Sequence, residues 1–368
     1  MELMATCTLG LEGAVSRELK MMGYKILDSE NGRIRFKADL SDIPRLNIWI
    51  RSAERILLVV GKFEALSFDD LFDGVSSLPW EDFIPKDGRF PIVKVRTAKS
   101  VLFAKSAIQS IVKKAIVNRL SKIYGITIFP ENGSEYPVYV YLRKNMVTVS
   151  LDTTGRDGLH KRGYRKMYVE APLRETIAAA LLILSGWNRE KNLVDPFCGS
   201  GTICIEAGMM AGGIAPGMNR NFVSMNWGII PKKIWKEEFE KARSHRENSN
   251  EYEIIGGDVD EEAIKVAELN LRNLGVNLRI KFVNASFEKL RAFDESGIIV
   301  TNPPYGMRIS GTIREIHRRL KVLRHNFPGW RYNIISPFIK FERMFGMKAK
   351  RRYSFFNSGV RVHFFQFW

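Results

Sequence analysis

The chain has 368 residues, 45% of them hydrophobic, and carries a formal net charge of +17. This length predicts two or three domains, each large enough to bury a core of its own. The composition argues against a membrane-spanning protein, because the longest relevant apolar run, Ile177 to Leu184, is far shorter than a bilayer span. No secretion signal is visible at the N-terminus, so a cytoplasmic location is expected.

The excess of positive charge predicts a polyanionic partner. Nucleic acid is favoured over an acidic membrane surface, because the chain shows neither a lipidation signal nor a terminal polybasic tail. Three cysteines, Cys7, Cys198 and Cys204, are too few and too scattered for a disulfide framework. They also lack zinc-ligand spacing, so no metal site is expected.

The first half of the chain has the pattern of two α+β units, at residues 1–40 and 41–153. In the first unit we expect a strand at 4–8, a helix at 12–22, and a hairpin of strands 24–27 and 33–37 around an Asn-Gly turn. In the second we expect helices at 43–51, 68–76 and about 100–124, and strands at 55–62, 91–96, 138–143 and 146–152.

The long helix of the second unit lies in a strongly basic stretch. Between Gly88 and Pro130 there is no Asp or Glu, and such an unbalanced run favours phosphate contact over a merely solvated face. The apolar residues expected to face the core, leaving the lysines outward, are Ala104, Ile108, Ile111, Ala115 and Ile116. The residues expected to contact RNA here are Arg96, Lys99, Lys105, Lys113 and Lys114.

Residues 154–170 are rich in glycine and basic side chains, which is typical of a linker or functional loop. Arg162 and Arg165 in this segment are counted among the expected RNA contacts. We expect His160 to be a surface or hydrogen-bonded loop residue rather than a catalytic base.

Residues 171–368 alternate helices with strands, which predicts a doubly wound α/β sheet. Pro172 is placed to open a helix that runs to Leu184. Further helices are expected at 202–211, 233–246, 261–274, 313–326 and 340–346, and strands at 193–197, 253–259, 279–284, 297–301, 332–336, 351–357 and 360–368. A final hairpin would place an antiparallel strand at the end of the parallel sheet, giving seven strands in all, which is the topology expected of a class I methyltransferase rather than of a dehydrogenase.

The loop Asp195-Pro-Phe-Cys-Gly-Ser-Gly-Thr202 follows a buried strand and opens a helix, so its glycines let the backbone approach a ligand. A dinucleotide fingerprint fails at Cys204, and a P-loop fails because no lysine follows the glycines. The carboxylate of Asp195 suits a ligand ammonium group, and the helix start at Thr202 suits a carboxylate. S-adenosylmethionine carries both groups, although a purely structural loop remains the alternative. The expected cofactor contacts in this region are Pro172, Leu173, Asp195, Phe197, Gly199, Ser200, Gly201 and Thr202.

Two later strand ends extend this cofactor site. Asp258 can accept hydrogen bonds from both ribose hydroxyls, Val259 can pack on adenine, and Asp260 is expected to cap the next helix. The sequence Asn284-Ala285-Ser286 occupies the place where an adenine amino group would be recognised.

The apolar run Ile298-Ile299-Val300 leads into Thr301-Asn302-Pro303-Pro304-Tyr305. The two prolines end the strand in a rigid turn and leave backbone carbonyls unpaired. An amide oxygen of Asn302, a free carbonyl of Pro303 and the ring of Tyr305 suit a nucleobase amino group, and Asn302 would also border the cofactor. The alternative is an ordinary Pro-Pro turn that begins with Asn.

These motifs, with Gly257-Asp-Val-Asp260, resemble the amino-methyltransferases that act on exocyclic nitrogens of nucleobases. Residues Leu159-His-Lys-Arg-Gly-Tyr-Arg165 and Glu170-Ala-Pro-Leu-Arg-Glu-Thr176 resemble the THUMP-domain RNA methyltransferases over the whole chain. The resemblance implies a ferredoxin-like domain, a THUMP domain that grips the tRNA 3′ end, and an S-adenosylmethionine-dependent catalytic domain.

Within that group the chain is most similar to monomeric enzymes that form N2-methylguanosine at position six of the tRNA acceptor stem. The alternatives are a guanine-N2 methyltransferase acting on ribosomal RNA or another tRNA position, and an inactive RNA-binding protein.

Overall fold

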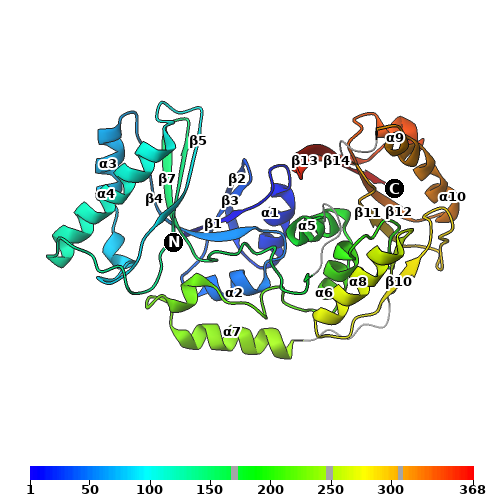
Figure 1. Cartoon of the computed structure of the whole chain (residues 1–368), viewed down its shortest axis with the longest axis horizontal. Helices are drawn as coiled ribbons and strands as arrows, with labels where there is room; N and C mark the ends of the chain where they lie inside the picture. The colour runs from blue at the N-terminus through cyan, green and yellow to red at the C-terminus, as the bar shows by residue number, and fades with distance from the viewer. Residues whose placement is uncertain (167–172, 246–251, 306–309) are drawn as a thin grey trace.

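The computed structural model describes residues 1–166, 173–245, 252–305 and 310–368 (Figure 1). Two seven-stranded sheets organise these residues. Among the described residues, no helix has the length and apolarity needed to cross a membrane.

The first sheet has the strand order β2-β3-β1-β4-β7-β6-β5, and only the β5–β6 pair is parallel. Its strands are β1 (Glu2–Thr6), β2 (Lys25–Glu30), β3 (Arg33–Lys37), β4 (Arg55–Glu64), β5 (Ile92–Ala98), β6 (Val138–Arg143) and β7 (Met146–Asp152). Strand β4 pairs with both β1 and β7, so one continuous sheet joins the two expected N-terminal units. The Asn-Gly turn between β2 and β3 is confirmed, with both Asn31 and Gly32 in the left-handed region.

Helices α1 (Glu12–Met21), α2 (Asp42–Trp49), α3 (Phe68–Ser76) and α4 (Lys105–Tyr124) accompany this sheet. Figure 1 shows α3 and α4 on one side of β4, β5 and β7, while the other side of these strands turns toward the catalytic half. The side chain of Ser67 caps α3 through the Asp70 N–H, and Gly125 ends α4 in the left-handed conformation.

The start of α4 corrects one expectation. The helix begins at Lys105, so Ala104 precedes it as an exposed residue instead of facing the core. The loop before α4 is hydrogen-bonded to Asn145 instead. The Val101 N–H donates to the Asn145 side chain, and the Ser100 hydroxyl accepts from the Asn145 N–H. Further along, Ile108, Ala115 and Ile116 are buried and Ile111 is half-buried, as the helical spacing predicts.

The second sheet has the order β10-β9-β8-β11-β12-β14-β13. Its strands are β8 (Leu193–Asp195), β9 (Ile254–Asp258), β10 (Ile280–Asn284), β11 (Ile298–Thr301), β12 (Arg331–Ser336), β13 (Arg351–Asn357) and β14 (Val360–Phe367). Strands β8 to β12 are parallel to one another, and β14 runs antiparallel between β12 and β13. The predicted seven-stranded sheet with an antiparallel final strand is confirmed.

Helices cover both faces of this sheet, as alternation along β11 shows. Ile298 and Val300 pack into one core cluster, and Ile299 packs into the other. These helices are α5 (Glu175–Ser185), α6 (Thr202–Ala211), α8 (Glu261–Asn273), α9 (Ser310–Arg319), α10 (Leu323–Asn326) and α11 (Phe341–Phe345). Helix α7 (Lys232–Ser244) packs instead against α2. The single helix expected over 313–326 is divided into α9, a 3₁₀ turn at Leu320–Val322, and α10. Pro172, the expected start of the first helix, lies outside the described residues, and α5 begins at Glu175.

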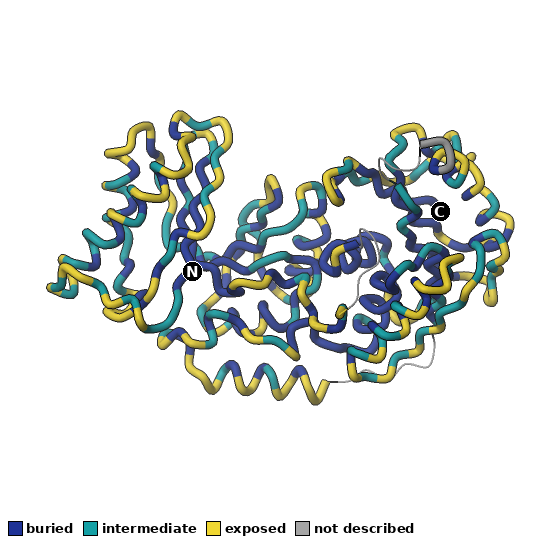
Figure 2. The backbone as a smooth tube through the Cα atoms, viewed as in Figure 1, coloured by how far each residue is buried: buried dark blue, intermediate teal, exposed yellow. Residues whose placement is uncertain are grey.

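The two halves pack through α1 and α5. Every residue of α5 is buried, and Arg17 on α1 donates a hydrogen bond to the Ile183 carbonyl at 3.1 Å. Figure 2 shows buried residues gathered where the N-terminal half meets α5 and α6. This contact fixes the catalytic sheet relative to the first sheet.

Candidate active site

The cofactor loop lies between β8 and α6, at the carboxyl edge of the second sheet. Gly199 and Gly201 both have positive φ, at 50° and 79°, where a side chain would be strained. The loop is held by two polar contacts: the Gly199 N–H donates to Asp258 at 2.9 Å, and the Asn270 side chain donates to the Ser200 carbonyl at 3.1 Å. The backbone is therefore fixed in a shape that brings it close to a ligand.

Asp195 ends β8 and is 1% exposed. Its Oδ1 accepts hydrogen bonds from the Thr301 hydroxyl at 2.7 Å and from the Phe197 N–H at 3.1 Å. Burial raises the pKa of Asp195 to about 7, because a carboxylate is costly to ionise away from water. A ligand cation beside it would favour the ionised form.

The ends of β9 and β10 meet at the same edge. Asp258 accepts from the Gly199 and Asp260 N–H groups, and Val259 exposes 70% of an apolar side chain beside it. The Asn284 side chain donates to the Asp258 and Val259 carbonyls. Ala285 also donates its N–H to the Asp258 carbonyl at 2.9 Å. Asp260 caps α8 through the Glu262 N–H, as expected.

The predicted adenine-recognition residues are thus close to the predicted ribose residue. Ser286 follows Ala285 and accepts a long hydrogen bond from the Glu288 N–H at 3.4 Å. Behind the loop, the Phe197 ring packs on Phe287 with a centroid distance of 4.9 Å. The roles of Asn284, Ala285 and Ser286 in binding adenine remain predictions.

The Asn-Pro-Pro-Tyr turn follows β11, which lies next to β8 in the sheet. The Asn302 side chain hydrogen-bonds the Tyr305 hydroxyl, and that hydroxyl also accepts from Asn357 at 2.7 Å. Burial raises the pKa of Tyr305 to about 12. In the described part of the chain, Asn302 Oδ1 is buried and has no hydrogen-bond partner. The amide that the sequence singles out therefore presents an unsatisfied acceptor.

His317 on α9 is hydrogen-bonded to this turn. It is fully buried, with Nε2 at 3.4 Å from the Pro304 carbonyl and Nδ1 at 3.1 Å from the Ser336 hydroxyl. Rings of Phe338 and Phe341 meet it edge-on. Burial lowers the pKa of His317 to about 4, so the imidazole is neutral at neutral pH and Nε2–H donates to Pro304.

Two arginines of the segment 154–166, Arg162 and Arg165, have buried side chains. The Arg162 side chain is 1% exposed and pairs with Glu206, with 3.3 Å between Nε and Oε1. Arg165 is 7% exposed and contacts Glu175, the Leu173 carbonyl and the Thr202 hydroxyl. The expectation that Arg162 and Arg165 contact RNA is wrong, because both side chains are buried and bond to other residues of the protein.

His160 is hydrogen-bonded in a loop, as expected, with Nδ1 at 3.1 Å from Glu54.

The expected basic surface is only partly as predicted. Lys99, Lys105 and Lys114 are exposed. Lys113 is half-buried, and its ammonium pairs with Glu131 and lies 3.5 Å from the centre of the Phe90 ring. A contact of Lys113 with RNA stays a prediction.

Arg96 belongs to a larger surface on the side of the first sheet opposite α3 and α4, which we call the basic sheet face. Its members are Arg33, Arg55, Lys94, Arg96, Tyr139 and Tyr141. The Arg33 guanidinium lies 3.6 Å from the centre of the Tyr141 ring, although three strands separate β3 from β6 in the sheet, so the sheet must curl strongly.

Charge accumulates on this face. Partial burial lowers the pKa of Lys94, and the nearby charges of Arg96 and Lys105 lower it further. Within the described ranges, Arg33, Lys94 and Arg96 form no ion pair with a carboxylate. Such a cluster of like charges favours a polyanionic ligand.

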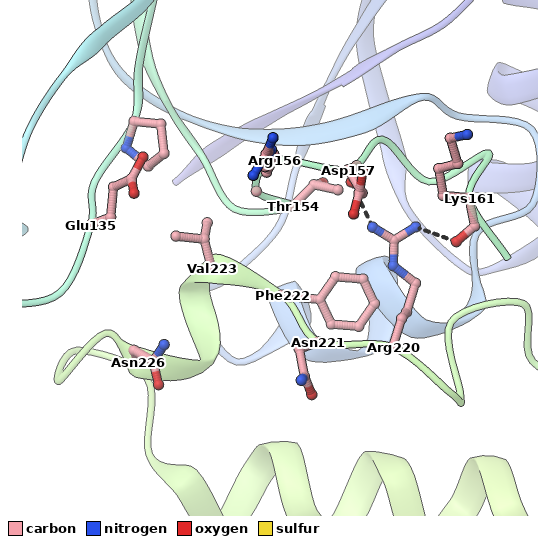
Figure 3. Close-up of a pocket in the computed structure, with 12 residues that line it drawn as sticks. Glu135, Thr154, Arg156, Asp157, Lys161, Arg220, Asn221, Phe222, Val223 and Asn226 are labelled. Carbon is pink, nitrogen blue, oxygen red and sulfur yellow. Dashed lines mark hydrogen bonds between the residues drawn. The ribbon is translucent and has the colours of Figure 1, made fainter. Parts of the chain in front are cut away.

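A separate cavity of about 500 Å³ lies between the 154–161 segment and residues 220–226 (Figure 3). Arg220 points across it and donates to the backbone carbonyls of Asp157, Gly158 and Lys161. Its donors are engaged with the protein's own backbone. No predicted catalytic or cofactor residue lines this cavity.

The family described as "RMKL-like, methyltransferase domain" matches residues 162–364. The chain belongs to this methyltransferase family. The "RlmL ferredoxin-like domain" matches residues 2–57 and the THUMP domain matches 65–152. The predicted bounds of 1–40, 41–153, 154–170 and 171–368 remain a prediction.

Two curated relatives carry RNA methyltransferase names. The chain is 36% identical over 100% of its length to the "Putative RNA methyltransferase YpsC" of Bacillus subtilis, of which it covers 95%. It is 33% identical to the "Ribosomal RNA large subunit methyltransferase K/L" of Cellvibrio japonicus, over 99% of this chain and 50% of that protein. The chain thus spans about half the length of the K/L relatives.

A solved structure titled "SMU.472, a putative methyltransferase complexed with SAH" has a TM-score of 0.91 and 35% identity, covering 100% of this chain and 97% of that one. The methyltransferase family and this neighbour identify the cofactor as S-adenosylmethionine, and the THUMP domain shows that the partner is RNA. The exposed Val259 beside Asp258 and the unpaired oxygen of Asn302 fit such a ligand.

Sequence reasoning missed several residues of the site. Thr301 holds Asp195, Asn270 holds the glycine loop, and His317 and Asn357 hold the turn. Asn270 does carry a local signal, because it is a polar residue at an apolar position of helix α8. Asn357 gives no such signal, because it meets Tyr305 from 52 residues away.

Proposed function

We propose that this protein transfers a methyl group from S-adenosylmethionine to the exocyclic N2 of a guanine in RNA. One observation carries the proposal: the buried Oδ1 of Asn302 has no hydrogen-bond partner in the described residues. An unpaired buried acceptor is costly, and an amino group with two N–H bonds satisfies it. The turn lies beside the glycine loop, because Thr301 hydrogen-bonds Asp195 at the start of that loop.

The chemistry follows from the weak nucleophilicity of an aromatic amine. S-adenosylmethionine supplies a methyl group bound to a positively charged sulfur. Asn302 Oδ1 and the Pro303 carbonyl accept the two amino N–H bonds, which turns the nitrogen lone pair toward that methyl group. Positioning and electrostatics then supply most of the rate enhancement. No strong base is needed, because the methylated nitrogen becomes acidic and loses its proton afterwards.

Two further groups orient the reactants. The Tyr305 ring, held through its hydroxyl by Asn302 and Asn357, stacks on a base flipped out of its helix, at a cost of a few kcal/mol. Asp195 binds the ammonium group of the cofactor, while Asp258 and Val259 hold its ribose and adenine. Pro304 keeps the turn rigid through its carbonyl contact with His317.

The choice of guanine rests on the resemblance to THUMP-domain methyltransferases, and the choice of RNA chain needs a direct test. The K/L relatives make large-subunit ribosomal RNA the first substrate to examine. Position six of the tRNA acceptor stem, with the 3′ end held by the THUMP domain, is the second. The THUMP resemblance favours it. A monomeric state and a cytoplasmic location also remain predictions.

The test is transfer of a labelled methyl group to unmodified large-subunit rRNA and to tRNA transcripts, followed by nucleoside analysis. We expect N2-methylguanosine in one of the two RNAs and none with Asn302→Ala. Methylation of another atom would contradict the assignment of the site. No transfer to either RNA, together with no thermal stabilisation by S-adenosylmethionine, would leave an inactive RNA-binding protein.

A further inference from the structure

The final hairpin of the chain carries an exposed aromatic ring next to the Asn-Pro-Pro-Tyr turn. Asn357, the last residue of β13, donates a hydrogen bond to the Tyr305 hydroxyl at 2.7 Å. Its neighbour Phe356 is 51% exposed. Leaving a phenylalanine ring in water is unfavourable, and neither the cofactor loop nor the turn itself uses this ring. Phe356 is therefore a candidate for contact with a partner.

The strand register places Phe356 beyond the carboxyl edge of the second sheet. Strand β14 runs antiparallel to β12, and His363 pairs with Ser336, the last residue of β12. Phe356 pairs with Arg361, two residues closer to the hairpin turn, which is about 7 Å further along the strand. Strand β11, which leads into the Asn-Pro-Pro-Tyr turn, is parallel to β12 and ends at the same edge. The tip of the hairpin thus projects past the edge at which the methyl-transfer site lies.

The ring and a guanidinium group share one face of this tip. Ser358 and Gly359 have φ values of 49° and 81°, so they form the tight two-residue turn that fixes a hairpin register. Side chains of directly opposed residues point to the same face of a sheet. Phe356 and Arg361 are such a pair, and both are exposed. The tip therefore offers an aromatic surface and a positive charge side by side.

The surroundings of the tip are basic. After Glu342 the sequence contains no Asp or Glu, and the hairpin exposes Arg351, Arg352 and Arg361. Burial lowers the pKa of His363, and the charges of Arg352 and Arg361 lower it further. A basic stretch that lacks acidic residues fits the phosphate backbone of a nucleic acid.

A second copy of the chain is the other possible occupant, because β13 is the edge strand of the second sheet. The N-terminal loop covers part of that edge: a Cβ atom at Gly10 would be 1.9 Å from the Ser354 carbonyl oxygen. Pairing along the whole of β13 is therefore obstructed. Figure 1 shows β13 and β14 on the side of the second sheet that is nearer the N-terminal half. An RNA that contacts both the N-terminal half and Tyr305 meets this hairpin.

We infer that Phe356 stacks on a base of the RNA stem next to the flipped nucleotide, while Arg361 binds an adjoining phosphate. This inference rests on the proposed function, since it assumes that the target base leaves its helix to reach Tyr305. Flipping exposes the faces of the neighbouring bases. An aromatic ring can cover such a face whatever the base, and a guanidinium group suits a phosphate.

The test compares two versions of the RNA that the wild-type protein methylates. In the first, the target nucleotide is paired in its stem; in the second, changes in the opposite strand unpair the target and its neighbours. Methyl transfer is measured under single-turnover conditions. Phe356→Ala should lower the rate about tenfold on the paired RNA and less than about threefold on the unpaired RNA, because an unpaired base costs little to flip.

Two further variants show whether the ring itself is responsible. Phe356→Tyr keeps an aromatic ring and should retain the wild-type rate on both RNAs. The matched control is Phe293→Ala, which removes a 39% exposed ring that packs on Trp330, just before β12 at the opposite edge of the sheet. It should leave both rates unchanged.

Arg361→Gln tests the phosphate contact separately. It should raise the RNA concentration needed for half-maximal rate about three- to fivefold at low salt, and by less at high salt. An unchanged concentration would overturn the assignment of Arg361.

Equal losses on the two RNAs in Phe356→Ala, or no loss on either, would overturn the inference and leave the proposed function standing. The absence of transfer by the wild-type protein would overturn both. Sedimentation velocity addresses the second copy: a wild-type dimer that Phe356→Ala converts to a monomer would also overturn the inference. If Phe356→Ala does not fold, as judged by circular dichroism, Phe356→Leu keeps an apolar side chain without a ring and gives the same comparison.

Discussion

The molecule contains two seven-stranded sheets that are built for different tasks. The first is mostly antiparallel and carries exposed cations on the side that faces away from α3 and α4. The second is mostly parallel, with core clusters on both faces. Its site residues lie at one edge, where Asp195 and Thr301 are buried. A long polyanion is bound by many weak contacts, whereas chemistry at one nitrogen needs a few fixed atoms.

This difference predicts how each sheet responds to mutation. Single substitutions at the carboxyl edge of the second sheet should have large effects that do not depend on salt. Substitutions on the basic sheet face should have small, additive effects that weaken as salt is added. The four predictions below run from the largest effect to the smallest.

The largest effect is expected for Asn302→Ala. Loss of the acceptor for the target amino group should lower the rate of methyl transfer about 1,000-fold. RNA affinity, measured by filter binding, should change by less than about twofold, because the phosphates are held elsewhere. Asn357→Ala is the matched control, since it removes the second contact to Tyr305 and should cost much less. Wild-type activity in Asn302→Ala would contradict the expectation that one substitution at the carboxyl edge of the second sheet has a large effect.

Asp195→Asn should weaken S-adenosylmethionine binding about 100-fold, because a buried carboxylate is replaced by a neutral group. The pKa of Asp195 is raised to about 7, and a bound cation favours the ionised form. Binding to the wild-type protein should therefore release a proton and tighten about tenfold between pH 6 and pH 8. Calorimetry in buffers of different ionisation enthalpy measures that release. Persistence of the same pH dependence in Asp195→Asn would show that another group titrates.

His317 gives a prediction for stability. Its pKa falls from 6.5 to about 4 on folding, so the unfolded chain binds more protons between these values. Stability from this group is complete above pH 6.5 and is lost as pH falls toward 4. The wild-type protein should lose about 2 kcal/mol of unfolding free energy between pH 7.5 and pH 5 that His317→Gln does not lose. Urea unfolding at both pH values measures the difference, and parallel losses would refute the assignment.

The smallest effects are expected on the first sheet. Arg96→Glu and Lys94→Glu, both on the basic sheet face, should each weaken RNA binding about five- to tenfold at low salt, and by less at high salt. Lys113→Glu is the informative partner, because Lys113 already pairs with Glu131. It should change RNA affinity by less than about threefold. A larger effect for Lys113 than for Arg96 would indicate that RNA binds α4 instead of the basic sheet face.

The sequence was most informative where the signal is local. The Asn-Gly turn at Asn31, the glycine loop before Thr202 and the Asn302 turn depend on a few adjacent residues, and the structure has them where the pattern predicts. The alternation of helices and strands that builds the second sheet was also predicted, from the short apolar runs. The helix over 313–326 was less regular than expected, because no single residue marks the 3₁₀ turn at Leu320–Val322.

The sequence was least informative where a charge has a distant partner. Arg162 and Lys113 look like solvated cations in the sequence, but Glu206 and Glu131 neutralise them in the fold. Arg33 lies over Tyr141 only because the first sheet curls. Such pairs depend on tertiary packing, which leaves no periodic trace in the chain.

The most direct test of the central claim is the identity of the methylated atom. RNA treated with the wild-type protein and S-adenosylmethionine is digested to nucleosides, which are separated and identified by mass spectrometry against standards. The account predicts N2-methylguanosine from the wild-type protein and none from Asn302→Ala. A methyl group on a ring nitrogen or on ribose, or undiminished product from Asn302→Ala, would contradict it.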